Sequence, residues 1–477
     1  MVFSGASYHL ALWSRCSCYD ANRHTQEKVY PLKDLSHQVN LIQSNDTLQF
    51  VREAMAWTDI ILFVAVLIIA WLILYLRGVF EPKVQYRSDR RLVLSDANFL
   101  PLLMGFSQSL STQAHICGFW SQPNQIYAAR LGAIRKAQHI IQFETFFMTP
   151  GARANEFADA LVERSQSGVR VQVLVDRIGT MKIPSSYWKR LKAAGVEVRF
   201  FHSFKLKAPL QYLSRSHRKL LIVDGTVAFI GGMGVSDNWD GDPNIGDTAP
   251  WLDCEIELEN AIVPVLVGIF LRHWLYEDGK ASGGYFPPQQ SSAEAKPMLV
   301  IPHDAESKVS SINTLFWFSL QAAQQRIWIA SPYFILDRNT RTALIKAKKR
   351  GVDVRIVTTS ARNDKPPVYY AARERYRHLL PAGIAIYEYQ PSMIHAKLML
   401  VDRDWISFGS TNFDPRSFYH NDELNLAWFD PDFAPTLEIL LQDAFGKSDR
   451  IEWSTWRRRP WWQRSIGQFF LLLRWQL

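Results

Sequence analysis

Two short stretches of this chain carry a histidine, a lysine and an aspartate in the same pattern, His-x-Lys-x4-Asp. The six residues are His217, Lys219, Asp224, His395, Lys397 and Asp402. Three fixed residues of these types match by chance at roughly one start position in ten thousand at ordinary composition. One copy alone is typical of an ordinary surface strand, but two copies in one chain predict a catalytic set.

These residue types suit displacement at the phosphorus of a phosphodiester. A neutral imidazole can attack phosphorus and form a covalent phosphohistidine. The second imidazole can protonate the leaving oxygen and then deprotonate the incoming alcohol or water. Two lysines would stabilise charge on the non-bridging oxygens. The pattern therefore predicts chemistry that needs neither a metal ion nor a cofactor.

Small residues in the turns after the two motifs are predicted to complete a phosphate site. A histidine and a lysine two positions apart on a strand project from the same face. The turn after the first motif contains Gly232, and the turn after the second contains Ser410 and Asn412. Small side chains there let backbone and side-chain donors approach a phosphate closely.

The region around the motifs is internally duplicated. In each half, three segments end in runs of β-branched residues that predict strands, and helical stretches lie between them. The matching segments are 137–147 with 323–334, 167–176 with 350–359, and 194–201 with 382–389. Strands that alternate with helices predict an α/β fold built twice.

The duplication sets the predicted domain boundaries. The first repeat covers residues 95–276 and the second covers residues 298–447. Residues 277–297 between them are polar and rich in Gly, Pro, Ser and Gln, which is typical of a linker. Residues 448–477 are rich in tryptophan and arginine and end in an apolar patch. They suit an amphipathic tail at a membrane interface, and the alternative is a terminal helix packed on the protein's own surface.

An uncharged apolar run at residues 60–76 predicts one transmembrane helix within residues 55–80. Basic residues concentrate just after the run, from Arg77 through the linker at residues 81–94, whereas only Arg52 lies close before it. The positive-inside rule therefore predicts a single-pass protein with its large C-terminal part in the cytoplasm.

Residues 1–54 show little helical or strand periodicity, and Met55 stands just before the span. Met55 is therefore an alternative start of translation, in which case the N-terminal extension 1–54 is not translated.

Net charge and cysteine spacing limit the kinds of binding partner, metal and disulfide that the chain is expected to have. A net charge of +9 favours partners that carry phosphate, either nucleic acid or an anionic membrane surface. The four cysteines lack the spacing of a zinc site and imply no disulfide framework. Because of the membrane span, we expect anionic phospholipids and the membrane, and no nucleic acid, as partners.

Over roughly residues 95–447 the chain resembles the phospholipase D superfamily, and within it the bacterial cardiolipin synthases. Besides the two motifs, the marks are the segments Gly409–Ser417 and Ser331–Asp337, together with Glu144, Asp176 and Gly179. The resemblance implies two tandem α/β/α sandwich domains related by a pseudo-twofold, with the active site between them.

The resemblance also implies roles for single residues. Asp253 and Glu423 match the carboxylates that back the two histidines, some thirty residues downstream of each. His217 is then the nucleophile and His395 the acid and base. Gly234 departs from the pattern, because the family has asparagine there, and this loss could move the nucleophile to His395. The turn Met148–Gly151 departs as well, which leaves the preference for donor and acceptor open.

These expectations lead to a membrane-anchored phosphatidyltransferase of the bacterial cytoplasmic membrane. It would make cardiolipin from two phosphatidylglycerol molecules and release glycerol. One alternative is a phospholipase D-type hydrolase, in which water replaces the acceptor alcohol. A nuclease is favoured only by the positive charge, and a catalytically dead lipid-binding scaffold would need a damaged motif, whereas all six motif residues are present.

Overall fold

The computed structural model describes residues 57–74, 92–202, 214–277, 287–288, 292–305 and 309–476. The chain divides into two compact units, residues 1–72 and 73–477. In the described residues, Trp57–Leu74 is the one helix long and apolar enough to cross a membrane, with a mean hydropathy of 2.6 and none of it buried. The predicted extension 1–54 and nearly all of the basic linker 81–94 lie outside the described residues.

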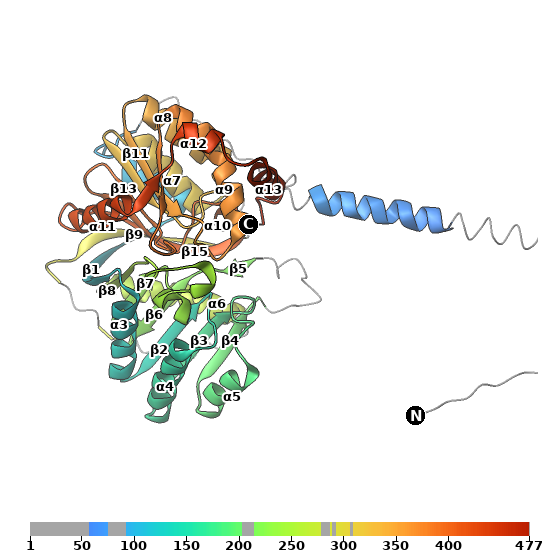
Figure 1. The fold of residues 1–477 in the computed structure, drawn as a ribbon. Coiled ribbons are helices and arrows are strands. Elements are labelled where there is room, and N and C mark those ends of the chain that lie inside the picture. The colour runs from blue at the N-terminus through green and yellow to red at the C-terminus, as the bar shows by residue number, and fades with distance from the viewer. Residues whose placement is uncertain are drawn as a thin grey trace, which may run out of the picture. The chain divides into compact units, whose positions relative to one another are not determined.

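The second unit is built on one sheet, in which the described residues form 16 strands (Figure 1). From its centre outward, the first half contains β1 (Leu110–Trp120), β8 (Glu255–Glu259), β7 (Val227–Gly231), β6 (Lys219–Val223), β2 (Ile140–Thr145), β3 (Arg170–Asp176) and β4 (Glu197–Phe201). The second half contains β9 (Lys296–His303), β15 (Asn421–Phe429), β14 (Trp405–Gly409), β13 (Leu398–Val401), β10 (Arg326–Ala330), β11 (Asp353–Thr359), β12 (Ala385–Tyr389) and β16 (Ser448–Arg450).

The two halves repeat the same strand order, and β1 pairs antiparallel with β9 where they meet. The duplication predicted from the sequence is therefore confirmed, and the two sheets join edge to edge. Two boundaries differ from the prediction. Lys296 and Pro297 were expected in the linker but begin β9, and Ser448–Arg450 was expected in the tail but forms the edge strand β16.

Helices cover both faces of the sheet. They are α2 (Phe99–Ser107), α3 (Pro123–Lys136), α4 (Ala152–Gln166), α5 (Ser185–Ala193), α6 (Ile262–Tyr276), α7 (Ser311–Ala322), α8 (Arg338–Lys349), α9 (Pro366–Leu379), α10 (Pro415–Tyr419), α11 (Ala434–Gly446), α12 (Trp453–Arg457) and α13 (Trp461–Leu472). The central strands β2, β6, β13 and β14 are buried along their whole length. Burial on both faces explains the continuous apolar runs of β6 after Lys219 and of β13.

One core cluster contains residues of both repeats. The apolar faces of α6 and α11 pack with Leu220 and Ile222 of β6 and with Leu398 and Leu400 of β13. A second cluster lies under α3, α4 and α5, and a third under α2, α7 and α8. The shared core holds the two motif strands in one rigid framework.

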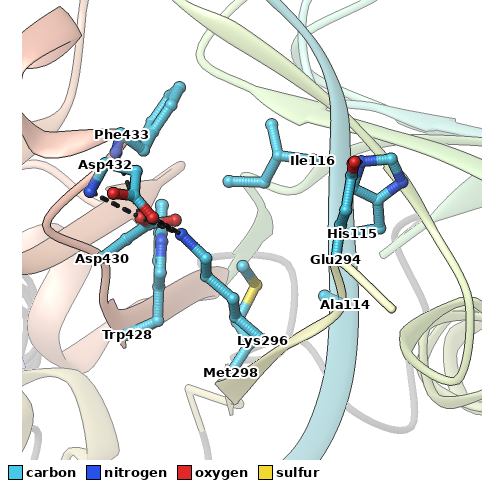
Figure 2. Close-up of a pocket in the computed structure, with 10 residues that line it drawn as sticks. All are labelled: Ala114, His115, Ile116, Glu294, Lys296, Met298, Trp428, Asp430, Asp432 and Phe433. Carbon is cyan, nitrogen blue, oxygen red and sulfur yellow. Dashed lines mark hydrogen bonds and ion pairs between the residues drawn. The ribbon is translucent and has the colours of Figure 1, made fainter. Parts of the chain in front are cut away.

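Figure 2 shows a pocket at the seam between β1, β9 and the end of β15. Lys296 points from β9 toward two aspartates and pairs with Asp430 at 2.5 Å and with Asp432 at 2.7 Å. His115 of β1 pairs with Glu294 at 2.9 Å. No residue of either motif lines this pocket, so it is separate from the site described next.

Candidate active site

The segment that leads into each motif pairs with a strand of the other half. Before the first motif, β5 (Arg215–Ser216) pairs in parallel with β15 at Asn421 and Asp422. Before the second motif, Ile394 forms a parallel bridge with Leu252. The backbone N–H of His217 donates to the carbonyl of Asp422 at 2.8 Å, and that of His395 donates to the carbonyl of Leu252 at 2.7 Å. Each histidine therefore enters the site along the other repeat.

This pairing exchanges the carboxylates that contact the two imidazoles. Nδ1 of His217 lies 3.0 Å from Oε2 of Glu423, and Nδ1 of His395 lies 2.7 Å from Oδ2 of Asp253. The structure thus brings together all four residues, but Asp253 contacts the histidine of the second half and Glu423 that of the first. Because Nδ1 of each ring is engaged, Nε2 is the nitrogen that remains for chemistry.

Two residues predicted to bind phosphate support these carboxylates instead. The hydroxyl of Ser410 donates to Glu423, and its backbone N–H donates to Leu424 at 3.0 Å. Gly232 donates its N–H to the carbonyl of Cys254 at 3.2 Å. A Cβ at position 232 would collide with the Asp253 carboxylate, so glycine lets that carboxylate approach. The donors of Ser410 and Gly232 that were expected to face phosphate therefore bond to groups of the protein itself.

Asn412 stands in the turn after the second motif. Its side chain is buried, and its carbonyl oxygen has no partner among the described residues. Gly234 stands at the matching place in the first half. A Cβ at position 234 would collide with the carbonyl oxygen of Phe147. The first half therefore has no room for the asparagine that the family pattern would put there.

Both motif lysines are buried beside their histidines. Nζ of Lys219 donates to the carbonyl of His217 at 2.6 Å, and Nζ of Lys397 donates to the carbonyl of His395. Burial, and then the charge of Lys397, hold the pKa of Lys219 well below its ordinary value. Burial lowers the pKa of Lys397 to about 8. Two ammonium groups confined together in this way would be stabilised by an anion placed between them.

Both imidazoles are neutral at neutral pH. Burial, followed by the charges of Lys219 and Lys397, holds the pKa of His217 well below its ordinary value. Burial and Lys397 lower the pKa of His395 to about 4, although Asp253 acts in the opposite direction. A neutral ring is the form that can attack phosphorus.

The two carboxylates differ in how readily they ionise. Burial raises the pKa of Glu423 to about 7, against the charge of Lys219. Burial also opposes ionisation of Asp253, but His395 and Lys397 outweigh it and lower the pKa of Asp253. The indole N–H of Trp239, at 2.9 Å from Oδ2 of Asp253, stabilises that charge further. Asp253, which contacts His395, is therefore ionised more readily than Glu423, which contacts His217.

The motif aspartates do not face the histidines. The carboxylate of Asp224 accepts from the backbone N–H groups of residues 138, 139 and 140, at 2.7, 2.7 and 2.9 Å. The carboxylate of Asp402 accepts from those of residues 324, 325 and 326, at 3.0, 2.7 and 3.1 Å. Lys219 lies at the other end of the motif strand from Asp224, roughly 15 Å away along it. The sequence analysis places both aspartates in the catalytic set, and in the structure their carboxylates cap the starts of β2 and β10.

Two further acidic residues hold the segment before the first motif. Asp176 accepts from the backbone N–H of Ser216 at 3.1 Å and from that of Gly179 at 3.1 Å. Glu144 accepts from the hydroxyl of Ser216 at 2.6 Å. These family landmarks therefore position β5, which in turn positions the first histidine.

Aromatic rings that the sequence analysis did not single out pack on the two imidazoles. The ring of Phe146 lies 5.1 Å from that of His217, with its edge toward it. The rings of Trp239 and Trp251 lie 5.2 and 5.9 Å from that of His395. No spacing rule points to these residues. Their contacts depend on turns that the tertiary structure brings to the histidines.

A family model described as cardiolipin synthase, PLD-like domain, matches residues 131–241 and 318–443, which contain the two motifs. Cardiolipin synthase 2 of Bacillus anthracis is 32% identical over 360 residues, which cover 73% of this chain and 68% of that protein. Cardiolipin synthase of Geobacillus sp. (strain WCH70) is 31% identical over 357 residues, which cover 74% of this chain and 70% of that protein.

The fold also occurs among solved structures. The crystal structure of phosphatidylserine synthase from Haemophilus influenzae Rd KW20 superimposes with a TM-score of 0.60 at 14% identity. The match covers 80% of this chain and 100% of that one. Together with the family match over both motif regions and the identity to the curated proteins, this shows that the chain belongs to the cardiolipin synthase family of phospholipase D-like proteins.

Proposed function

We propose that this chain is a membrane-anchored phosphatidyltransferase that makes cardiolipin from two phosphatidylglycerol molecules and releases glycerol. The observation that carries the proposal is the exchanged pairing of His217 with Glu423 and of His395 with Asp253. It puts two neutral imidazoles and two buried lysines into one site. The relatives named cardiolipin synthase supply the choice of lipid.

In the first step, Nε2 of His217 attacks the phosphorus of one phosphatidylglycerol. The bond from phosphorus to the glycerol oxygen breaks, and His395 gives a proton to that oxygen, so glycerol leaves. Lys219 and Lys397 stabilise the charge on the non-bridging oxygens. The product of this step is a phosphatidyl group bound to His217.

His395 needs a proton for the first step, although its pKa is about 4 without substrate. A bound phosphodiester carries a negative charge between Lys219 and Lys397. That charge offsets the two ammonium groups and so favours the protonated ring. Substrate binding therefore prepares the acid, with Asp253 stabilising the imidazolium.

In the second step, His395 takes the proton from a hydroxyl of the second phosphatidylglycerol. The resulting oxygen attacks phosphorus, the bond to Nε2 of His217 breaks, and cardiolipin is released. His217 returns to its neutral form and His395 again carries the proton. No metal ion enters either step, because the lysines supply the positive charge.

The environments of the two rings support this division of labour. The ionised carboxylate of Asp253 favours a ring that gains and loses a proton, which suits the acid and base. Burial raises the pKa of Glu423 to about 7, so this carboxyl ionises less readily than Asp253 and favours the protonated ring less, which suits a ring that stays neutral and attacks. We therefore assign the nucleophile to His217.

The membrane placement rests on the helix Trp57–Leu74 and on the charges that follow it. We infer a single-pass protein of the bacterial cytoplasmic membrane, with the catalytic unit in the cytoplasm. The basic residues after the span support this side by the positive-inside rule. Protease protection in oriented membrane vesicles tests it, and a catalytic unit cleaved from the periplasmic side would contradict it.

The reaction is tested with the full chain reconstituted in vesicles that contain phosphatidylglycerol. We expect cardiolipin and glycerol in equal amounts, and loss of both in His217→Ala and His395→Ala. His115→Ala at the seam pocket is the matched control and should keep full activity. Phosphatidic acid without cardiolipin would show a hydrolase instead. Mapping the trapped phosphoenzyme decides the roles, because label on His395 would reverse them.

A further inference from the structure

The C-terminal helix α13 packs on the catalytic unit through one face. At Gly467 a Cβ would lie 2.6 Å from the side chain of Glu374 and 2.6 Å from the carbonyl of Tyr370, so α13 approaches α9 closely there. Leu471, one turn further on, is buried in the same interface. The tail thus contains a helix that packs on the protein's own surface through this face.

The opposite face of α13 exposes large apolar side chains, together with the polar Ser465 and Gln468. Trp461, Phe469 and Leu472 are 76%, 58% and 46% exposed. Their spacing of eight and three residues puts them on one side of a helix with 3.6 residues per turn. Trp462, next to this stripe, is 43% exposed. A short helix that exposes four large apolar side chains in this way marks an interaction surface.

Positive charge surrounds the stripe. Residues 453–476 contain five arginines and no aspartate or glutamate. Arg459 forms an ion pair with Glu374. The other arginines near the stripe are exposed at the surface; they are Arg457, Arg458 and Arg464. Two of these three also line a pocket beside the helix.

That pocket combines aromatic rings with cations. Trp453 and Trp456 stack there, with their rings 5.2 Å apart, and Trp461 and Arg377 line it as well. Arginine donors suit the phosphate of a lipid headgroup. Tryptophan rings suit the boundary between headgroups and acyl chains.

We propose that α12 and α13 form a second membrane contact, in which the outer stripe of α13 inserts into an anionic phospholipid bilayer and the flanking arginines bind its phosphates. The charge selects this partner, since every charged residue of α12 and α13 is an arginine, and exposed apolar side chains flanked by arginines match an anionic interface. The proposal concerns a surface outside the motif residues and does not depend on which reaction they catalyse.

The surface adjoins the candidate active site. Beyond α13, the ring of Trp475 lies 5.0 Å from that of Tyr419 at the end of α10. The carbonyl of Gln476 accepts from Arg416 of α10 at 3.0 Å. The chain continues from α10 directly into β15, which carries Glu423. The segment after α13 therefore contacts the helix that leads into the strand carrying Glu423.

A photoreactive residue tests the contact. Benzoylphenylalanine replaces Phe469 or Leu472 in the full chain, which is reconstituted in vesicles of phosphatidylcholine with phosphatidylglycerol. Ile439 of α11 is the matched control, because it is equally a large apolar residue on a helix and is 68% exposed. We expect lipid adducts several-fold more often at positions 469 and 472 than at 439. Unchanged thermal unfolding shows that each variant is folded.

Three outcomes would overturn the proposal. Equal adduct yields at positions 439 and 469 would show that the face does not contact lipid. Adducts with another protein in native membranes would show a protein interface. A yield that stays the same in vesicles of phosphatidylcholine alone would remove the role given to the arginines.

Kinetics give a second readout. Trp461→Ser with Phe469→Ser should raise several-fold the mole fraction of phosphatidylglycerol that gives half-maximal rate, with kcat unchanged. Ile439→Ser should change neither value. If the protein proves to be a hydrolase, the adducts still test the surface, so the failure of this inference is distinguishable from failure of the proposed reaction.

Discussion

Asp253 and His395 lie 142 positions apart and in opposite halves of the molecule, yet Oδ2 of Asp253 and Nδ1 of His395 are 2.7 Å apart. The partner pair, Glu423 and His217, is separated by 206 positions. Each half therefore supplies a histidine that the other half must orient. Neither repeat contains a complete site, which gives a physical reason for the chain to keep both motifs.

The pairing of each histidine with a carboxylate of the other half predicts which variants lose the same catalytic step. With a phosphatidyl ester of p-nitrophenol, the leaving group needs no proton, so the acid is dispensable in the first step. Asp253→Asn and His395→Ala should keep the burst of p-nitrophenolate that reports the phosphoenzyme. His217→Ala should give no burst, because it lacks the nucleophile, and Glu423→Gln should give a slower one, because the ring loses the carboxylate that orients it.

Rapid-quench measurement of the burst tests this grouping. Pairing by sequence order would group Asp253→Asn with His217→Ala instead. A burst lost in Asp253→Asn but kept in Glu423→Gln would therefore contradict the exchanged arrangement or the assignment of the nucleophile.

The motif aspartates should affect stability more than chemistry. Asp224→Ala leaves three backbone N–H groups at the start of β2 without their acceptor, and Asp402→Ala does the same at β10. We expect each variant to lose about 1–3 kcal/mol of unfolding free energy. Denaturant unfolding measures this loss.

Lys219→Ala is the comparison for that prediction, since it removes a charge from the site itself. At a temperature where all three variants are folded, the aspartate variants should keep most of their kcat and Lys219→Ala should not. A normal stability with a lost kcat in Asp224→Ala would return that residue to the catalytic set.

Restoring the family asparagine in the first half should damage the protein. In Gly234→Asn the new Cβ collides with the carbonyl of Phe147, so we expect a loss of about 1–3 kcal/mol in stability and no gain in activity. Gly132→Ala in α3 is the control, because nothing lies within 4 Å of its Cβ position and alanine favours the helix. A more active and equally stable Gly234→Asn would refute the steric argument.

The pH dependence of kcat/KM should be bell-shaped. Burial raises the pKa of Glu423 to about 7, so below that pH the carboxyl is protonated and no longer accepts from His217, and activity falls as pH falls. Burial lowers the pKa of Lys397 to about 8, so above that pH the ammonium charge is lost, and activity falls as pH rises. His395 has a pKa of about 4 in the free enzyme and takes up its proton when the phosphodiester binds, so this uptake adds to the loss of kcat/KM as pH rises.

Glu423→Gln isolates the acidic limb of that profile. The amide cannot titrate, so the variant should have a lower rate that no longer falls below pH 7. An acidic limb that persists unchanged in Glu423→Gln would assign it to another group.

Much of the fold follows from local sequence patterns. Strands such as β2, β3, β10 and β11 are rich in β-branched residues and follow helical stretches, which is why the sequence predicts them. The two copies of the motif likewise predict a phosphoryl-transfer site with two histidines and two lysines. The candidate membrane span can be recognised in the sequence as an apolar run, because the length and apolar composition of a helix decide whether it can cross a bilayer.

The working arrangement of the site was decided by tertiary structure alone. Spacing assigns Asp253 to the half that contains His217, whereas β5 and Ile394 cross to the other half and exchange the partners. Ser410, which the sequence analysis predicts to bind phosphate, donates its hydroxyl to Glu423 in the structure. The physical reason is that periodicity reports which face of an element is buried, but not which distant element covers that face, and the chemistry of this site depends on those distant contacts.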